Sequence, residues 1–363
     1  MIEIKEKVVI FENPIPNLVS RHAYFPGLTK ISEGDIIALF SIGEAFESMN
    51  SRICISRSTD EGKTWNFEGA IFKDTFNNMG PCTLKPTLLD NNSIIAIGYG
   101  FYRDNPEVFI NLKTGGLPKG VNVVSFSYNR GKSWTLPETI PLSRPGLFEI
   151  SGPCIQLKDG DIIASGTSFP DWEGKYPSGK IGVILRSKDN GMSWDDNTIF
   201  FSSRDIVAYE SRLCQMDDGR VLVMLWLYDE KNKRNLTNHI VVSYDNGFSW
   251  SEPIDTGIFG QASNLLHLDK NLLLSIHCFR EKDVGLYLNI VEFKDSWNVI
   301  FSKKIWGNTE GREIKGLKDM GKSLKFGQPS IFPVKDNKEF LVVFWAVEDC
   351  ISKILGYRVC IGV

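Results

Sequence analysis

Short apolar runs alternate with polar turns along most of the chain. One recurring unit places a polar turn between two apolar runs, as in Ile31–Ile37 and Leu157–Ile163. Turns of this kind lie near residues 34, 92, 160, 219, 271 and 337. Apolar runs of this length joined by Gly, Asn or Asp are typical of β-hairpins. The pattern therefore predicts six hairpins, evenly distributed over the sequence.

A second repeat has the form Ser-x-Asp/Asn-x-Gly-x-Ser/Thr-Trp and occurs four times, at Ser58–Trp65, Ser127–Trp134, Ser187–Trp194 and Ser243–Trp250. In such a turn the Asp or Asn side chain accepts hydrogen bonds from backbone amides, and Gly supplies a positive φ. The Trp packs back onto the sheet. We predict structural rather than catalytic roles for the following residues: Asp60, Trp65, Asn129, Trp134, Asp189, Trp194, Asp245 and Trp250.

The two repeats are in phase, because each copy of the second follows one of the first four hairpins. Six units of four strands describe an all-β, six-bladed propeller with antiparallel blades. The sixth unit lacks a fourth strand, and the N-terminal run Lys7–Phe11 is predicted to supply it and close the ring. No long helical pattern interrupts the repeats. We expect residues 1–363 to form a single propeller domain.

Composition limits the class of partner. The chain carries 41 basic and 44 acidic residues, so no basic face and no nucleic-acid partner are expected. Seven cysteines occur without Cys-x-x-Cys spacing, which argues against a metal site and for thiols in a reducing compartment. The N-terminus has no apolar leader, and no stretch has the pattern of a membrane span. These features predict a cytoplasmic protein without cofactor, metal or membrane contact.

Blade geometry predicts where a ligand binds. The first strand of an antiparallel blade begins at the face where the second strand ends, and both polar turns lie at the opposite face. Polar residues at these strand ends should therefore surround the axis, and arginines, carboxylates and amides there suit a small carbohydrate. The candidates are Arg21, Glu47, Lys85, Arg103, Glu149, Glu210, Gln261, His277, Arg280 and Gln328.

Several candidates also have a purely structural interpretation. Glu47 could be a solvated loop charge, and Arg212 could serve only as the ion-pair partner of Glu210. His277 fits a hydrogen-bonded wall residue better than a proton shuttle.

With its four Asp boxes and its strand pattern, the chain resembles the sialidase superfamily. Sialidases hold a substrate carboxylate with three arginines and use a Tyr nucleophile activated by Glu, with an Asp acid/base. The resemblance implies that Arg21 and Arg280 are two of these arginines and that Arg234 is the nearest candidate for the remaining one. It also implies that Glu210 matches the Glu that activates the nucleophile and that Glu348 braces Arg21.

The sequence departs from the family in two places. No Tyr lies near Phe326–Ser330, where the nucleophile is expected, and the loop that should carry the Asp offers Glu44, Glu47 and Asn50 instead. Tyr24 and Tyr209 are the nearest substitutes. Tyr209 adjoins Glu210, and neighbouring strand residues point to opposite faces, so Tyr209 is predicted to be a poor replacement.

The leading hypothesis is an exo-acting glycoside hydrolase for an acidic or otherwise modified sugar. A pair of carboxylates among Glu47, Glu149 and Glu210 would catalyse acid/base hydrolysis. Ordinary α-sialosides are expected to be poor substrates. A non-catalytic carbohydrate-binding propeller is the second hypothesis, and a propeller lyase acting on a uronate is the third.

Overall fold

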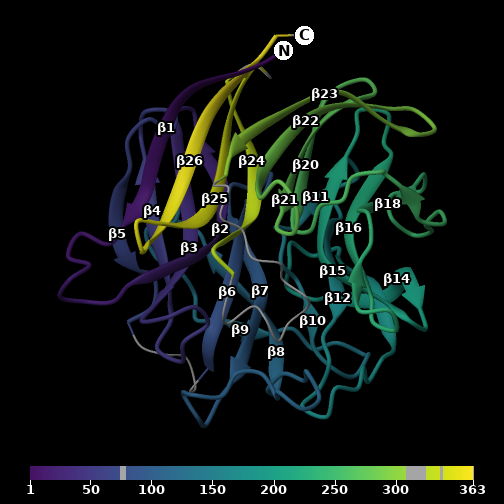
Figure 1. Ribbon diagram of the computed structural model, residues 1–363, viewed down its shortest axis with the longest axis horizontal. Coiled ribbons are helices and arrows are strands. Elements are labelled where there is room, and N and C mark those ends of the chain that lie inside the picture. The colour runs from purple at the N-terminus through teal and green to yellow at the C-terminus, as the bar shows by residue number, and fades with distance from the viewer. Residues whose placement is uncertain (74–78, 308–323, 336–337, 363) are drawn as a thin grey trace.

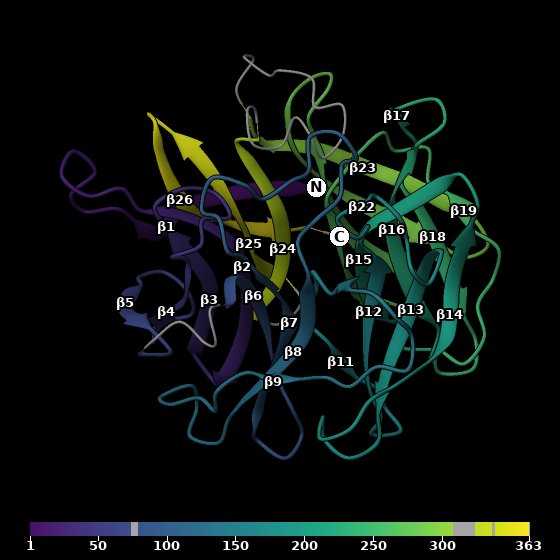
Figure 2. The ribbon, with the colours of Figure 1, turned by 90° about the horizontal axis from the view of Figure 1, so that it is seen from below.

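Six antiparallel sheets of four or five strands surround a common axis in a computed structural model, which describes residues 1–73, 79–307, 324–335 and 338–362 (Figures 1 and 2). The described residues contain no helix. Each sheet is one blade, and the blades follow the chain in order around the ring. The predicted six-bladed propeller is confirmed.

The first three blades are built from local hairpins. Blade 1 comprises β2 (His22–Ser32), β3 (Asp35–Gly43), β4 (Arg52–Ser58) and β5 (Asn66–Ala70). Blade 2 comprises β6 (Met79–Leu88), β7 (Ile94–Tyr102), β8 (Gly120–Ser127) and β9 (Glu138–Thr139). Blade 3 comprises β10 (Phe148–Glu149), β11 (Ile155–Gln156), β12 (Ile162–Ser168), β13 (Lys180–Ser187) and β14 (Asp195–Ser203).

The last three blades follow the same plan. Blade 4 comprises β15 (Ile206–Gln215), β16 (Val221–Asp229), β17 (Arg234–Asn235), β18 (His239–Ser243) and β19 (Ile254–Asp255). Blade 5 comprises β20 (Ser263–Asp269), β21 (Leu272–Phe279), β22 (Gly285–Phe293) and β23 (Trp297–Trp306). Blade 6 comprises β24 (Phe326–Lys335), β25 (Glu339–Glu348), β26 (Ile351–Ile361) and β1 (Ile2–Glu12). The turn predicted near residue 337 lies outside the described residues.

The N-terminal strand closes the ring, as predicted. β1 pairs antiparallel with β26 from Ile2 opposite Ile361 to Glu12 opposite Lys353, so the two chain ends lie side by side (Figure 1). Gly356 permits this approach, because a Cβ atom there would lie 2.7 Å from the Val8 side chain. The closure pairs a sheet edge that would otherwise be open to other chains.

The apolar core lies between the blades. Each of six core clusters joins two neighbouring sheets, and one of them packs Leu274 and Leu288 of blade 5 against Val342 and Phe344 of blade 6. Both faces of the inner strands are therefore buried, which explains runs such as Val221–Leu227 without polar alternation.

The four Ser-x-Asp/Asn turns form the predicted hydrogen bonds. In the first, Asp60 accepts from the amides of Lys63 and Thr64, and the Ser58 hydroxyl accepts from the amide of Gly62. Gly62 has a φ of 77°. The indole nitrogens of Trp65, Trp194 and Trp250 each donate to the carbonyl of the turn Gly, whereas that of Trp134 has no partner among the described residues.

Candidate active site

The innermost strands bulge where they approach the axis. Pairing shifts between Tyr24 and Gly27, between Tyr209 and Arg212, and between Gly327 and Ser330. Each bulge holds a non-glycine residue with positive φ: Phe25 at 57°, Glu210 at 43° and Gln328 at 42°. Bulges redirect side chains, and strained backbone of this kind concentrates at functional sites. All three residues line one cavity.

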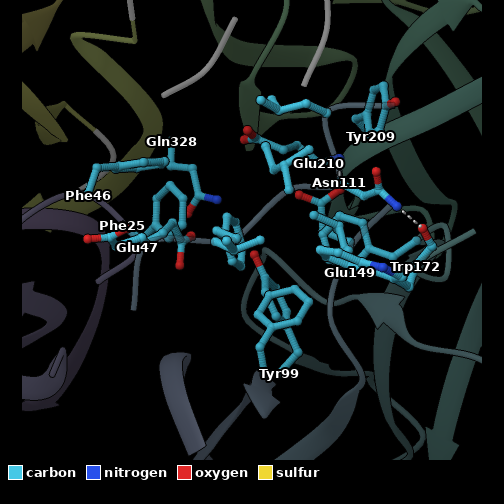
Figure 3. A pocket seen from close by; sticks show the side chains of 18 of the residues that line it. Phe25, Phe46, Glu47, Tyr99, Asn111, Glu149, Trp172, Tyr209, Glu210 and Gln328 are labelled. Carbon is cyan, nitrogen blue, oxygen red and sulfur yellow. Dashed lines mark hydrogen bonds between the residues drawn. The ribbon is translucent and has the colours of Figure 1, made fainter. Parts of the chain in front are cut away.

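This axial cavity has a volume of about 750 Å³ and is lined by residues of blades 1, 2, 3, 4 and 6 (Figure 3). Its size suits a small ligand. The lining residues are Phe25, Phe46, Glu47, Tyr99, Phe101, Glu107, Val108, Phe109, Ile110, Asn111, Leu112, Lys113, Leu117, Glu149, Phe169, Trp172, Tyr209, Glu210, Trp226 and Gln328. All three predicted catalytic carboxylates are among them.

Glu47 is buried beside Phe25 and Phe46 on one side of the cavity (Figure 3). Its φ of 56° is strained, and the Arg103 guanidinium donates a hydrogen bond to its backbone carbonyl. Among the described residues no hydrogen bond or ion pair reaches its carboxyl group. Burial raises the pKa of Glu47 to about 8; Arg103 opposes the rise, and the charge of Glu149 adds to it. Glu47 is therefore a buried group, not a solvated loop charge.

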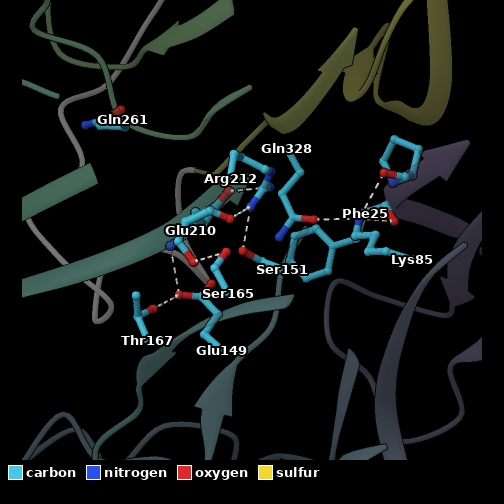
Figure 4. A network of polar contacts seen from close by, with 12 residues as sticks. Phe25, Lys85, Glu149, Ser151, Ser165, Thr167, Glu210, Arg212, Gln261 and Gln328 are labelled. Carbon is cyan, nitrogen blue, oxygen red and sulfur yellow. Dashed lines mark hydrogen bonds and ion pairs between the residues drawn. The ribbon is translucent and has the colours of Figure 1, made fainter. Parts of the chain in front are cut away.

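Glu149 and Glu210 lie together on the other side of the cavity (Figures 3 and 4). Glu149 Oε2 accepts a hydrogen bond of 3.0 Å from the backbone amide of Glu210 and one of 3.4 Å from Thr167. Burial and the charge of Glu210 raise the pKa of Glu149. Glu210 forms an ion pair with Arg212 at 3.4 Å, and Arg212 also donates to Ser151 at 2.6 Å.

Lys85 positions Gln328 instead of lining the cavity. Its buried ammonium group donates to the carbonyls of Phe25 and Pro26 and to Gln328 Oε1, at 2.7, 2.9 and 2.8 Å (Figure 4). All three of its donors are used in this way. Because Gln328 Oε1 accepts from Lys85, the amide NH₂ group of Gln328 is the donor available to a ligand.

Aromatic side chains form most of the remaining wall. Tyr99, Phe101 and Phe169 pack edge-to-face or tilted against one another, and Tyr209 packs against Trp226 with ring centroids 5.0 Å apart. Tyr209 and Glu210 both contribute to the lining of the cavity. The bulge breaks the two-residue alternation there. Tyr24, by contrast, is fully buried and outside the cavity lining.

The three arginines implied by the resemblance are not part of the described lining. Arg21 is half-buried, and no hydrogen bond or ion pair connects it to another described residue. Glu348, its expected partner, pairs with Lys7 at 2.7 Å. Arg234 is exposed and lies 3.7 Å from Asp229, beside a separate surface pocket. Arg280 is buried behind the wall, with its guanidinium 5.7 Å from the ring of Trp226.

Three further candidates also lie behind the wall. His277 is fully buried and hydrogen-bonded to Asn238 and Ser275, and burial lowers its pKa to about 3. Gln261 is buried apart from the carboxylates (Figure 4). Within the described part of the chain, the Arg103 guanidinium donates to backbone carbonyls alone. Direct substrate contact by these residues finds no support in this geometry, and His277 fits the structural interpretation.

The sequence interpretation missed the segment 107–113 and Trp172. Residues 103–119 join β7 to β8, and this connection is far longer than the two-residue turn between β2 and β3. Long ordered connections in compact domains are commonly functional, so loop length was the signal available. Trp172 has no such signal in the sequence, since it follows β12 in an ordinary polar loop.

Acid/base chemistry is the reactivity that this arrangement supports. Glu47, whose pKa is raised by burial to about 8, faces the Glu210–Arg212 ion pair across an aromatic-walled cavity. Among the described residues no group of three or more His, Cys, Asp or Glu side chains has the geometry to hold a metal ion. In the same part of the chain, no helix has the length and apolarity needed to cross a membrane.

Comparison with solved structures supports the fold. The chain is similar to a crystal structure of a Dyadobacter fermentans protein of unknown function, with a TM-score of 0.77, 21% identity and 99% of both chains covered. It is similar to the NanB sialidase of Streptococcus pneumoniae, with a TM-score of 0.65, 13% identity and coverage of 98% of this chain and 70% of that one.

The Trypanosoma rangeli sialidase in complex with sialic acid is also similar, with a TM-score of 0.65 and 14% identity; 99% of this chain matches 58% of that one. Scans of protein-family models and of curated proteins found no match. At these identities the comparisons establish a sialidase-like propeller fold.

Proposed function

We propose that the protein is an exo-acting glycoside hydrolase that binds a neutral sugar in the axial cavity and cleaves its glycosidic bond by acid/base chemistry. One observation carries the proposal: Glu47, with a pKa of about 8, faces the Glu210–Arg212 ion pair across the cavity. Glu47 is thus suited to donate a proton, and Glu210, paired with Arg212, is suited to act as the carboxylate; glycoside hydrolysis requires these two roles.

Each carboxyl group then has a distinct role. Glu47 donates its proton to the glycosidic oxygen as the bond breaks. Glu210, held by Arg212, acts from the opposite side, either as the nucleophile or as the base that activates water. Glu149 is a positioning residue, because its carboxyl group accepts a hydrogen bond from the backbone amide of Glu210. The aromatic walls stack on the sugar ring, and the Gln328 amide donates to a hydroxyl group.

The charges in the cavity favour an uncharged sugar over the acidic one that the sequence suggested. The described lining contains four glutamates, one lysine and no arginine. A substrate carboxylate in such a cavity would find no arginine of the described lining to hold it in a bidentate fork. This agrees with the expectation that ordinary α-sialosides are poor substrates.

A panel of aryl glycosides tests the proposal. We expect turnover of at least one neutral glycoside and little turnover of α-sialosides and uronides. Activity should fall above about pH 8, because Glu47 then loses the proton that it must donate. Glu47→Gln should remove this alkaline limb and slow substrates with poor leaving groups by about 10²- to 10⁴-fold.

Glu44→Gln is the matched control, since Glu44 is exposed in the same loop and lies outside the described lining. It should leave rate and pH profile unchanged. If sugars bind but no glycoside in the panel is cleaved, the protein is a binding propeller and the hydrolase proposal is wrong. Fast α-sialoside turnover would contradict the assigned substrate class.

A further inference from the structure

The axial cavity changes character from its inner end to its mouth. Tyr99, Glu149 and Glu210 at the inner end are buried. At the mouth, Val108, Leu112 and Trp172 line the same cavity with 39%, 72% and 38% of their surfaces exposed. Glu107 and Lys113 also line the cavity and are exposed, so the accessible part of the wall combines three apolar side chains with two charged ones. We call the three apolar residues the apolar rim.

The blade-2 part of the apolar rim is held in shape by Arg103. Its guanidinium donates to the backbone carbonyls of Glu47, Pro106 and Val108, and it lies 5.2 Å from the ring of Phe109. One buried side chain therefore connects the loop that carries Glu47 to the segment that carries Val108. The rim is fixed relative to the proposed acid.

The blade-3 part is fixed to the same segment. The Asn111 amide and the Thr114 hydroxyl both donate to the carbonyl of Trp172, at 3.0 and 2.8 Å (Figure 3). Gly116 permits this contact, because a Cβ atom there would lie 2.1 Å from the Asp171 carbonyl. The backbone of Trp172 is thereby anchored, while its indole faces the cavity mouth. Such preorganisation lowers the entropic cost of binding a ligand.

Asn111, which lies beside Leu112 in the cavity lining, uses its hydrogen-bonding groups in internal contacts. Asn111 Oδ1 accepts from the amides of Lys113 and Thr114, and its NH₂ group donates to Trp172. A second sugar unit needs several donors and acceptors at fixed positions, and the side chains of Val108 and Leu112 offer none. An apolar group needs only surface to cover, and each Å² removed from water is favourable.

We propose that the apolar rim binds the aglycone of the substrate, and that this aglycone is an apolar, ring-bearing alcohol rather than another sugar. The inference rests on the proposed function, because it places the sugar at Glu47 and Glu210. The bond to be cleaved then lies between the carboxylates and the rim. The leaving alcohol departs through the open mouth along Trp172 and Leu112.

The test uses one sugar with several aglycones. Glycosides of phenols with matched leaving-group pKa but increasing apolar area, up to naphthyl, are compared with the glycosyl fluoride, which has no aglycone. In the unmodified protein kcat/KM should rise about tenfold or more across the series, as expected for burial of an additional ring. Leu112→Ser and Trp172→Ala should each flatten this rise.

Tyr244→Ser is the control, because Tyr244 is 75% exposed and follows β18 at the end of blade 4 away from the cavity. It should leave the rise intact. Leu112→Ser tests the rim even if Trp172→Ala misfolds, since most of the Leu112 surface is already in water.

The outcomes separate the two proposals. Hydrolysis of the fluoride without any dependence on apolar area would overturn the rim assignment and leave the hydrolase proposal standing. If no fluoride is hydrolysed, the hydrolase proposal fails. Equilibrium binding of naphthyl and methyl glycosides then tests whether the rim binds an apolar aglycone, and equal affinities would overturn that assignment.

Discussion

Carboxyl groups at the two ends of the propeller behave in opposite ways. At the turn end, burial would raise the pKa of Asp60, but hydrogen bonds from Thr64, Ser58 and Lys63 outweigh it and lower the pKa to about 2. At the cavity end, the carboxyl group of Glu47 receives no hydrogen bond from a described residue, and burial raises its pKa to about 8. Hydrogen-bond donors lower the pKa of Asp60, whereas burial without donors to the carboxyl group raises that of Glu47.

The backbone shows the same contrast. At the turn end, positive φ values occur at equivalent positions of each repeat. Glu61 and Gly62 in blade 1 correspond to Asn246 and Gly247 in blade 4, and the two turns have the same shape. At the cavity end, positive φ values at Phe25, Glu210 and Gln328 sit in bulges and direct different side chains toward one space. Repetition maintains the fold, and local departures from it create the site.

The largest expected difference between the two ends is in catalysis. Glu210→Gln removes the carboxylate that acts on the sugar, so kcat/KM on the best aryl glycoside should fall by about 10³-fold or more. Asp245→Asn alters a turn, and Asn129 already fills the equivalent position in another blade. It should change kcat/KM by no more than about twofold. Steady-state kinetics of the two variants measures the contrast, and equal losses would refute it.

Tryptophans at the two ends should differ in how much they contribute to the stability of the protein. Trp194 donates to the Gly191 carbonyl and packs against the core between blades 2 and 3. Because it is only partly exposed, Trp194→Ala should lower the free energy of unfolding by about 3 kcal/mol. Trp172→Ala, at the cavity mouth, should lower it by less than about 1 kcal/mol. Urea unfolding compares them; a larger loss at Trp172 would contradict the division of roles.

The pH dependence of stability should have opposite signs at the two ends. Glu47 has a folded pKa of about 8, above its usual 4.5, so the folded state retains a proton that the unfolded chain loses. Its contribution is greatest below about pH 4.5 and is lost as pH rises to about 8. Water entry moderates the effect, which we expect to be about 2 kcal/mol. Glu47→Gln should flatten this limb in urea unfolding between pH 5 and pH 9; an unchanged slope would contradict the raised pKa.

Much of the fold follows from the sequence because its determinants are local. The turn residues Ser58, Asp60 and Gly62 lie within five positions, and their chemistry identifies the turn without knowledge of the rest of the chain. The order of hairpins then gives the blade count. The same phase places Glu47, Glu149 and Glu210 at one end of the ring, and the structure brings all three to one cavity.

The arginines and Tyr209 show where this reasoning stops. The position of Arg280 after the second strand of its blade identifies the end of the blade at which it lies. It does not tell whether the side chain reaches the cavity or packs behind Trp226. A bulge interrupts the strand pairing between Tyr209 and Arg212, and the sequence carries no clear signal for it. The segment 107–113 is held in place by Arg103 and Trp172. Arg103 also binds Glu47, and Trp172 accepts from Asn111, and both contacts join residues far apart in the sequence.

The smallest expected effect is at Asp60. Its folded pKa of about 2 lies below the usual 3.8, so its stabilising contribution is complete above about pH 4 and is lost as pH falls through about 2. Solvent screens this partly exposed group, so Asp60→Asn should cost less than about 1 kcal/mol at pH 7. Asn129 shows why, since its Oδ1 accepts the Ser133 amide and its NH₂ donates to the Ser133 hydroxyl. The difference between variant and unmodified protein in urea unfolding should therefore vanish toward pH 2. If it persists there undiminished, the turn is stabilised by the shape of its hydrogen bonds alone, and the electrostatic contrast between the two ends of the propeller loses its acidic half.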